Sequence, residues 1–196
     1  MSVDFWFPTV ILNDTIDNQE EINGALLTRI EEIRKEVPSG GRTWLAAPYN
    51  TCGTFDISKD PAFSTIIDEV TNKVHALAKS LGIDTNRNKF ECREGWLNIY
   101  NQNQFQEYHY HAGFRFSAVY YVQVPPNSSG IVFESPVGPD MMPMPTMLHS
   151  AVTDKTARYE VTAGQVIAFR SYLRHCVPAH MGGGERISLA FNYDLK

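Results

Sequence analysis

The spacing of hydrophobic residues changes near the middle of this chain of 196 residues. In residues 1–90 apolar side chains recur every three or four positions, as on one face of an α-helix. In residues 91–196 they alternate with polar ones, as in β-strands, and glycine or proline separates the runs. We therefore expect a single domain, residues 1–196, in which a helical support region precedes a β-rich core.

Two helices are predicted in the first half. One begins at Asp17, where Glu20 completes a capping box, and ends at a Pro-Ser-Gly-Gly turn. The other begins with Asp60 as N-cap and Pro61 as its first residue, and Gly82 ends it. Each helix carries an apolar stripe that could pack on a sheet.

The second half contains short alternating runs bounded by turn residues. Eight strands are expected: Gly95–Tyr100, Gln106–His111, Phe114–Val124, Ile131–Glu134, Tyr159–Thr162, Gln165–Phe169, His175–Pro178 and Arg186–Tyr193. Short strands in this number are typical of a sandwich, a jelly roll or a barrel.

The polar faces of these strands are rich in His, Arg, Tyr and Asn, whereas a solvated face favours Lys, Glu and Thr. The shared faces are Arg186, Ser188, Ala190 and Asn192; Trp96, Asn98 and Tyr100; Glu107, His109 and His111; and Arg115, Ser117, Val119 and Tyr121. One arrangement packs the apolar faces on the helices and lines a cavity with the polar faces. An ordinary sandwich with its polar face in water is the alternative.

Composition argues against several classes of function. The net charge is −5 and no run of Lys and Arg is present, so nucleic-acid binding is not expected. The three cysteines, an odd number without CxxC spacing, predict neither a disulfide framework nor a cysteine-only zinc site. No apolar stretch of about 18 residues predicts a membrane span, and the first residues lack the basic segment of a signal peptide. A cytoplasmic location is therefore expected.

His109-Tyr110-His111 places two imidazoles on the same side of a strand, where both can reach one metal ion. His175, on a late strand, is the candidate third ligand. Three ligands on one side of a metal leave positions open for other molecules, as in non-haem iron sites, which generally use two histidines and a carboxylate. Two histidines at this spacing are common elsewhere, and imidazole also suits zinc, copper and nickel.

An arginine and a serine follow His175 on the last strand. Arg186 and Ser188 share a strand face, so together they could hold a carboxylate, Arg by two parallel hydrogen bonds and Ser by its hydroxyl. A guanidinium inside a barrel requires an anion, which a dicarboxylate would supply. The other histidines, His75, His149 and His180, are expected to be surface or loop residues rather than ligands.

The segment from Trp96 to the C-terminus resembles the catalytic core of the 2-oxoglutarate and Fe(II)-dependent oxygenases, in particular a bacterial and phage branch similar to the prolyl-hydroxylase-like group. The matching segments are 96–100 (WLNIY), 109–111 (HYH), 117–122 (SAVYYV), 129–133 (SGIVF), 168–175 (AFRSYLRH) and 186–192 (RISLAFN). They occur in the order of the family and cover about half of the chain.

This resemblance implies a mainly β fold: a double-stranded β-helix, or jelly roll, with the N-terminal helices on the outer face of its major sheet. It implies Fe(II), 2-oxoglutarate and O2 as cofactor and co-substrates, and hydroxylation of an amino-acid or peptidyl side chain such as proline. His109 and His175 match metal ligands. Arg186 matches the residue that pairs with the far carboxylate of 2-oxoglutarate, with Ser188 and Tyr121 assisting. Asn98 and Tyr100 match the lining of the same pocket.

Position 111 departs from the family pattern, because a carboxylate is usual there and this chain has His111. Either three histidines hold the metal, or Glu107 replaces one of them or orients His109. Loss of the carboxylate also occurs in halogenases, which bind chloride there, but those enzymes have a small residue at this position.

Two other functions remain open from the sequence. A three-His cupin-type dioxygenase would not use 2-oxoglutarate, and a non-catalytic jelly roll would hold a closed metal site. The expected partner is a small molecule or a peptide, and a sheet edge or the N-terminal segment could form a homodimer. Arg115 is a candidate for substrate contact, and Trp6, Phe7 and Trp44 for packing. Residues 136–156, rich in Met and Pro, are either a lid or a plain surface loop.

Overall fold

The computed structural model describes residues 1–4, 7–41, 44–137 and 153–196. Its helices are α1 (Gln19–Glu36) and α2 (Ser64–Ser80), with short 3-10 turns η1 (Ile57–Lys59) and η2 (Pro61–Phe63) between them. The strands are β1 (Ile11–Thr15), β2 (Tyr49–Asn50), β3 (Phe90–Tyr100), β4 (Gln106–His109), β5 (Phe116–Gln123), β6 (Ile131–Glu134), β7 (Thr156–Tyr159), β8 (Gln165–Arg170), β9 (His175–Val177) and β10 (Arg186–Leu195).

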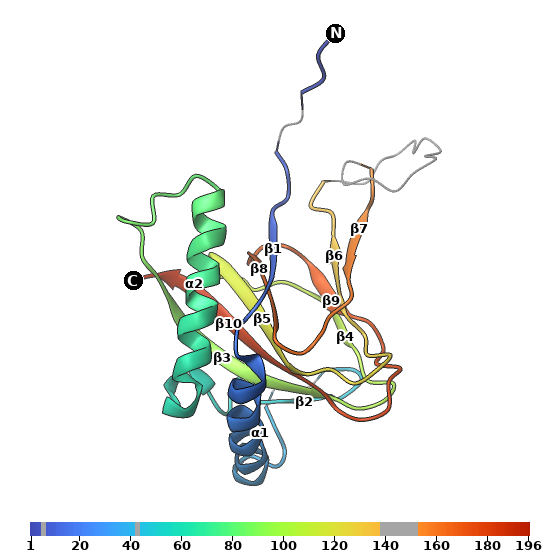
Figure 1. The fold of residues 1–196 in the computed structure, drawn as a ribbon. Coiled ribbons are helices and arrows are strands. Elements are labelled where there is room, and N and C mark those ends of the chain that lie inside the picture. Colours follow the sequence, from blue (N-terminus) through green and yellow to red (C-terminus); the bar gives the residue numbers. More distant parts are fainter. Residues whose placement is uncertain (5–6, 42–43, 138–152) are drawn as a thin grey trace.

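The strands form two antiparallel sheets. The larger sheet has the order β1-β8-β5-β10-β3-β2, and the smaller has the order β4-β9-β6-β7. Figure 1 shows α1 and α2 on the outer side of the larger sheet, with the smaller sheet on its other side. This is the double-stranded β-helix with helices on the outer face of the major sheet, so the predicted fold class is confirmed.

The predicted strands are confirmed in order, but their ends differ. Strand β3 begins at Phe90, five residues before the predicted Gly95. The seventh strand covers Thr156–Tyr159 and not the predicted Tyr159–Thr162. Strands β1 and β2 were not predicted, because each is short and lies at an edge of the larger sheet, where its hydrogen bonds come from a distant partner.

The helix starts were predicted with mixed success. Asp60 caps η2, since its side chain accepts a hydrogen bond from the Ala62 N–H, and α2 follows at once from Ser64. Asp17 does not cap α1. The N-cap of that helix is Asn18 in a left-handed conformation, and no side-chain capping bond is present. The capping box predicted there is therefore wrong.

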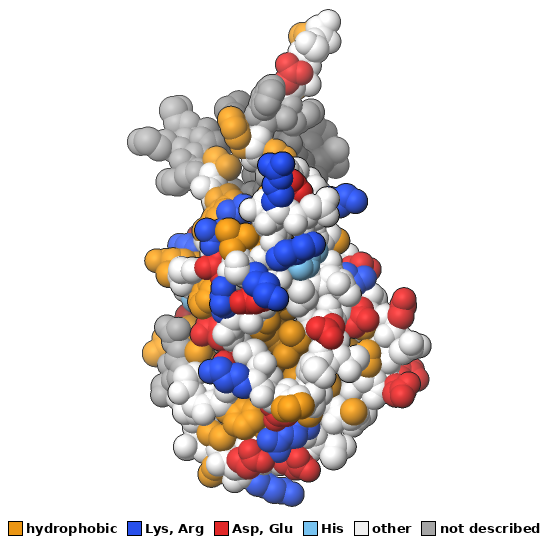
Figure 2. Space-filling model, turned by 90° about the vertical axis from the view of Figure 1, so that its left-hand side faces the viewer, with side chains coloured by type: hydrophobic (Ala, Val, Ile, Leu, Met, Phe, Trp, Pro, Cys, Tyr) orange, Lys and Arg blue, Asp and Glu red, His pale blue; other side chains and the backbone are white. Residues whose placement is uncertain are grey.

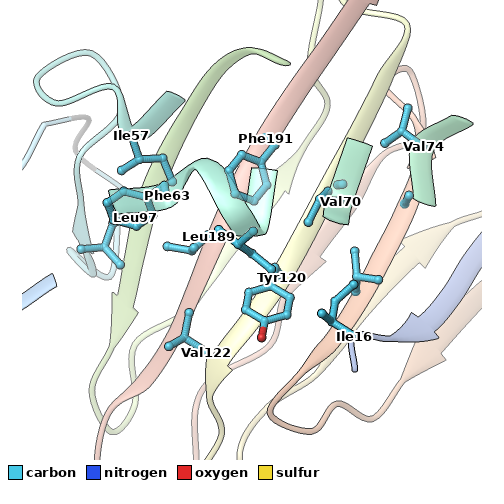
Figure 3. Close-up of a cluster of buried hydrophobic side chains, with 14 of the residues drawn as sticks. Ile16, Ile57, Phe63, Val70, Val74, Leu97, Tyr120, Val122, Leu189 and Phe191 are labelled. Carbon is cyan, nitrogen blue, oxygen red and sulfur yellow. The ribbon is translucent and has the colours of Figure 1, made fainter. Parts of the chain in front are cut away.

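The main hydrophobic core lies between the larger sheet and the helices. Figure 3 shows Val70 and Val74 from α2, Leu189 and Phe191 from β10, and Phe63 as members of one buried cluster. All five side chains are at most 1% exposed. Burying each contributes about 1.5–3 kcal/mol, so this core fixes the larger sheet as the platform for the site.

A smaller core fills part of the space between the two sheets. Phe169 on β8 and Phe133 on β6 contact each other edge to face, with ring centroids 4.9 Å apart. A cavity beside this core is lined by polar side chains of β3, β5 and β10 together with some apolar ones, as the polar faces predicted.

No helix in the described ranges combines the length and apolar character needed to cross a bilayer. On the face turned to the viewer in Figure 2, acidic and basic side chains are intermixed, with hydrophobic ones between them.

Candidate active site

Three histidines converge between the sheets. Potential ligand atoms of His109, His111 and His175 all lie within 4.8 Å of one another. His109 on β4 pairs with His175 on β9 in the strand register, and their ring centroids are 4.2 Å apart. The Nε2 atoms of His111 and His175 are 3.4 Å apart. The sequence therefore identified all three members of this cluster.

A bulge in β4 turns His109 into the cavity. Gln106 pairs with Val177 and His109 with His175, so β4 advances three residues where β9 advances two. One extra residue in a strand reverses the alternation beyond it. Gln106 and His109 consequently face the same side, and the prediction that Glu107 shares a face with His109 is wrong.

Glu107 lies outside the histidine cluster among the described residues. Its Oε1 accepts a hydrogen bond of 2.8 Å from the Leu45 N–H. Its backbone carbonyl, and not its carboxylate, contacts His109 Nδ1 at 2.7 Å. The residue thus orients His109 through its main chain, and the geometry gives no support to Glu107 as a ligand.

Backbone carbonyls set the orientation of two of the imidazoles. The Glu107 carbonyl accepts from His109 Nδ1, and the Leu173 carbonyl accepts from His175 Nδ1 at 2.9 Å. Because a carbonyl can only accept, Nδ1 carries the proton and Nε2 keeps its lone pair. His175 is 2% exposed, and burial, together with the nearby imidazoles of His109 and His111, lowers its pKa well below 6.5.

This donor set fits a divalent transition metal. Neutral imidazoles with converging lone pairs are good ligands for Fe(II) and its neighbours, and three of them leave coordination positions open. Aromatic rings enclose the cluster: Trp96 stacks on His111 at 5.5 Å, Phe169 packs on His175 at 4.7 Å, and Trp44 lies 5.0 Å from His109. Such packing keeps the imidazoles in place.

Trp44 was predicted only as a packing residue. It precedes β2 in a segment without periodic spacing, so nothing in the sequence indicated its position beside His109. Phe7, also predicted to pack, is 92% exposed, and Trp6 lies outside the described residues.

All the predicted co-substrate residues line the same cavity as the three histidines. They are Asn98 and Tyr100 from β3, Tyr121 from β5, and Arg186 and Ser188 from β10. Gln106, which was not predicted, lines it too and accepts a hydrogen bond of 2.6 Å from the Tyr100 hydroxyl. Tyr100 thus lines the cavity with its ring, while its hydroxyl donates to Gln106.

Arg186 is 1% exposed and makes no ion pair among the described residues. Its guanidinium carbon lies 4.9 Å from the ring of Tyr100 and 5.0 Å from that of Tyr121. Nε donates to the Ser129 carbonyl at 2.8 Å, whereas the contacts of the two terminal nitrogens, to Ser188 Oγ and the Gly130 carbonyl, are long, at 3.4 and 3.5 Å. A buried guanidinium whose terminal N–H groups make only long hydrogen bonds is suited to bind an anion, because the anion would compensate the buried charge.

Gly130 is required beside this arginine. A Cβ on Gly130 would come within 1.8 Å of the Tyr159 carbonyl oxygen. Only glycine therefore allows β6 to begin next to the end of β7 with its carbonyl close to Arg186.

Tyr121 adds a hydrogen-bond donor to the cavity. Among the described residues, its buried hydroxyl has no hydrogen-bond partner of ordinary geometry. Burial raises the pKa of Tyr121 to about 12, although the nearby Arg186 acts in the opposite direction. The hydroxyl consequently keeps its proton at neutral pH and can donate it to an anion beside Arg186.

Arg115, His75 and His180 are absent from the lining of the cavity. Arg115 pairs with Asp194 at the surface, so its predicted contact with substrate finds no support. His75 is half-buried rather than exposed, because its Nε2 accepts from the Phe90 N–H at 3.1 Å. His180 is a loop residue, as predicted, but it is fully buried and contacts the Gly184 carbonyl. His149 and most of residues 136–156 lie outside the described residues.

The fold and this cluster define a class, the jelly-roll non-haem metal oxygenases, and sequence comparison narrows it. Residues 94–192 match the family model described as "Putative 2OG-Fe(II) oxygenase", where 2OG is 2-oxoglutarate. The match covers 99 of the 196 residues (192 − 94 + 1). The chain belongs to this family of enzymes, which implies Fe(II) and 2-oxoglutarate. A comparison with curated proteins gave no significant match.

Solved structures with the same fold support the assignment of fold class. A prolyl-4-hydroxylase from Pseudomonas putida is 18% identical, with a TM-score of 0.61, over 94% of this chain and 92% of that one. HygX from Streptomyces hygroscopicus, with nickel and 2-oxoglutarate bound, is 14% identical, with a TM-score of 0.63, over 95% and 82%. The carbocyclase SnoK of nogalamycin biosynthesis is 10% identical, with a TM-score of 0.68, over 96% and 80%.

Proposed function

We propose that this oxygenase hydroxylates an amino-acid or peptidyl side chain, such as that of proline, with His109, His111 and His175 holding Fe(II). The observation that carries the proposal is the buried, unpaired Arg186 in the same cavity as the three imidazoles. A dicarboxylate that chelates the metal at one end and reaches the arginine at the other satisfies both groups.

Arg186 binds the far carboxylate of 2-oxoglutarate in this proposal. Its terminal nitrogens have only the long contacts described above, so a carboxylate gains two charge-assisted hydrogen bonds there. Ser188 and Tyr121 contribute hydroxyl groups to the same anion. The rings of Tyr100 and Tyr121 keep the guanidinium in one orientation.

When bound, Fe(II) with 2-oxoglutarate and O2 supplies the oxidising power for inserting one oxygen atom into a C–H bond; the other oxygen atom goes to succinate, and CO2 is released. The protein's part is orientation and the exclusion of water. The backbone carbonyls that fix His109 and His175 set the direction of their lone pairs. Phe133 and Phe169 pack against His175 and keep water from that side.

The groove outside the three histidines supports an amino-acid or peptide as the substrate. A groove of about 730 Å³ lies outside the cluster and shares His109 and His111 with the inner cavity. Its walls include Trp44, Tyr108 and Tyr110. Two proteins of similar fold are prolyl hydroxylases by name, the Pseudomonas putida enzyme and a collagen prolyl hydroxylase of Paramecium Bursaria Chlorella virus-1, the latter 13% identical with a TM-score of 0.54.

Oxygen-dependent turnover of 2-oxoglutarate tests the proposal. The Fe(II)-loaded protein is incubated with 2-oxoglutarate, ascorbate and a panel of free amino acids and short peptides that includes proline. Succinate is measured by NMR and products by mass spectrometry. We expect slow succinate release without substrate, and faster release with a panel member that gains one oxygen atom in equal amount. Folded, Fe(II)-loaded protein that never consumes 2-oxoglutarate would contradict the proposal.

A further inference from the structure

The inner face of the larger sheet is organised in rows along β3, β10 and β5. Tyr100 pairs with Arg186, and in the next row Asn98 pairs with Ser188. Trp96 and Ala190 form the third row, where the Trp96 ring stacks on His111. The rows therefore run from the proposed 2-oxoglutarate end to the metal.

A fourth row continues beyond the metal. It consists of Glu94 on β3, Asn192 on β10 and Ser117 on β5, which are paired in the strand register. It lies one strand repeat past Trp96, roughly 7 Å further along the sheet. The groove outside the histidines lies at this end, since Glu94 and Asn192 line it.

A partly buried hydrogen bond from Asn192 holds the Glu94 carboxylate in place, and buried hydrogen bonds hold Asn192. Asn192 Nδ2 donates to Glu94 Oε1 at 2.8 Å, and Ser117 Oγ donates to Asn192 Oδ1 at 2.7 Å. Ser117 also contacts the Ser171 hydroxyl at 2.9 Å, and the Ser171 carbonyl accepts from the His111 N–H at 2.9 Å. The same network thus positions Glu94 and the backbone that carries a metal-binding histidine.

Among the described residues, Glu94 is a charged side chain without an ion-pair partner. It lines the groove outside the metal and also an adjoining hollow. Within the described ranges, Arg174 in the groove pairs with Glu134 at 2.7 Å, and Lys59 in the hollow pairs with Asp56 at 3.2 Å. Glu94 makes no ion pair there, and its only side-chain hydrogen bond is the one to Asn192. Its second oxygen is available to a ligand.

The groove that Glu94 lines also has aromatic walls. Trp44, Trp96, Tyr108 and Phe114 line the same groove. A carboxylate among aromatic faces binds a positively charged nitrogen well, since the ion pair and the cation–π attraction add to each other.

We infer that Glu94 selects substrates with a positively charged nitrogen, such as a lysyl, arginyl or free amino-acid ammonium group. This inference rests on the proposed function and narrows its substrate class. The cation binds Glu94 about one strand repeat from the metal row, so the oxidised carbon is separated from the charged nitrogen by several bonds. Glu94 is then a specificity-determining residue.

Matched pairs of probes test this selection. The Fe(II)-loaded enzyme receives 2-oxoglutarate and capped glycyl-X-glycine peptides in which X is lysine or norleucine, or arginine or citrulline, and also free proline or N-acetylproline. In the lysine or the arginine pair the charged member should accelerate succinate release, with a kcat/KM about 10- to 100-fold above that of its neutral partner, whereas the proline pair, whose ring carbons lie within two bonds of the nitrogen, serves as the short-distance comparison. Isothermal titration into protein loaded with Ni(II) and 2-oxoglutarate should show the same preference without turnover.

Glu94→Gln should raise the KM of the charged probe by about the same factor, so that the charged and neutral members of the pair are used alike. The glutamine can still accept from Asn192, so the fold is kept. Glu91→Gln, on the same strand, removes an equal charge outside the groove and should keep the preference.

Three results would each overturn the inference. Neutral probes could bind as well as charged ones, no charged probe could produce a response, or Glu94→Gln could keep the preference of the wild type. If the protein still releases succinate without substrate in these cases, the inferred preference for a positively charged substrate is wrong and the proposed function stands. If no 2-oxoglutarate is consumed at all, the proposed function fails with it.

Discussion

His109 and His175 lie opposite each other on neighbouring strands, with ring centroids 4.2 Å apart. The β4 bulge places His109 there, and hydrogen bonds to backbone carbonyls orient both rings. A metal held by these residues would link β4 to β9 and so stabilise the smaller sheet. Metal binding should therefore affect folding stability as well as activity.

Replacing His175 by alanine should abolish stable metal binding, because two imidazoles remain and the most buried ligand is gone. The Fe(II) content after gel filtration should fall to background, and added Fe(II) should no longer raise the melting temperature. His75→Ala is the matched control, since His75 hydrogen-bonds to Phe90 on the outer side of the sheet, and it should keep its metal. A fully loaded His175→Ala protein would exclude His175 as a ligand.

His111→Ala and Glu107→Gln separate the two ligand sets considered from the sequence. His111→Ala should weaken metal binding by more than about tenfold, because it removes a direct ligand. Glu107→Gln should leave the metal affinity unchanged, since its carboxylate accepts from Leu45. The affinities are measured by competition with a chelator. The opposite order would assign the ligand role to Glu107.

Asp56 supports the strand that carries Glu94 and Trp96, and its contribution depends on pH. Its Oδ1 accepts from the Gly95 N–H and from Ser58. Burial opposes ionisation, but these hydrogen bonds outweigh it and lower the pKa of Asp56 below 3.8. The stabilisation is therefore fully present above pH 3.8 and is lost as the pH falls through the lower pKa of the folded state.

Asp56→Asn should accordingly reduce the free energy of unfolding by about 1–2 kcal/mol at pH 7, and by less in acid. Urea unfolding at several pH values measures this. Asp17→Asn is the control: Asp17 is exposed and does not cap α1, so this change should have little effect at any pH. An effect of Asp56→Asn that is equal at all pH values would contradict the assigned role of its charge.

Much of the predicted cavity lining lies on β3 and β10, which pair in regular register from Arg186 to Asn192. Arg186 and Ser188 share a face in that register, so period-two reasoning placed both in one cavity, although the pairing of β10 with β5 shifts between Ile187 and Ser188. Period-two reasoning failed in β4, where the bulge lies between Gln106 and His109. The bulge is defined by the pairing with β9, which the local sequence does not indicate.

Residues brought in by tertiary structure were also beyond prediction. Trp44 lies beside His109 but belongs to an irregular segment. Arg115 pairs at the surface with Asp194, which is distant in the sequence. Glu94 shares the face of Trp96 in the sequence, but its relation to the metal became visible only from the pairing with Asn192.

Anaerobic titration of the Fe(II) protein with 2-oxoglutarate tests the central claim most directly, since it requires the histidines and Arg186 to bind one molecule. Wild-type protein and the surface control Arg115→Ala should develop the weak visible charge-transfer band of a chelated keto acid. Arg186→Ala should need far more 2-oxoglutarate, with binding weaker by about 2–4 kcal/mol. No band in folded, Fe(II)-loaded wild-type protein, or equal affinity in Arg186→Ala, would contradict the account.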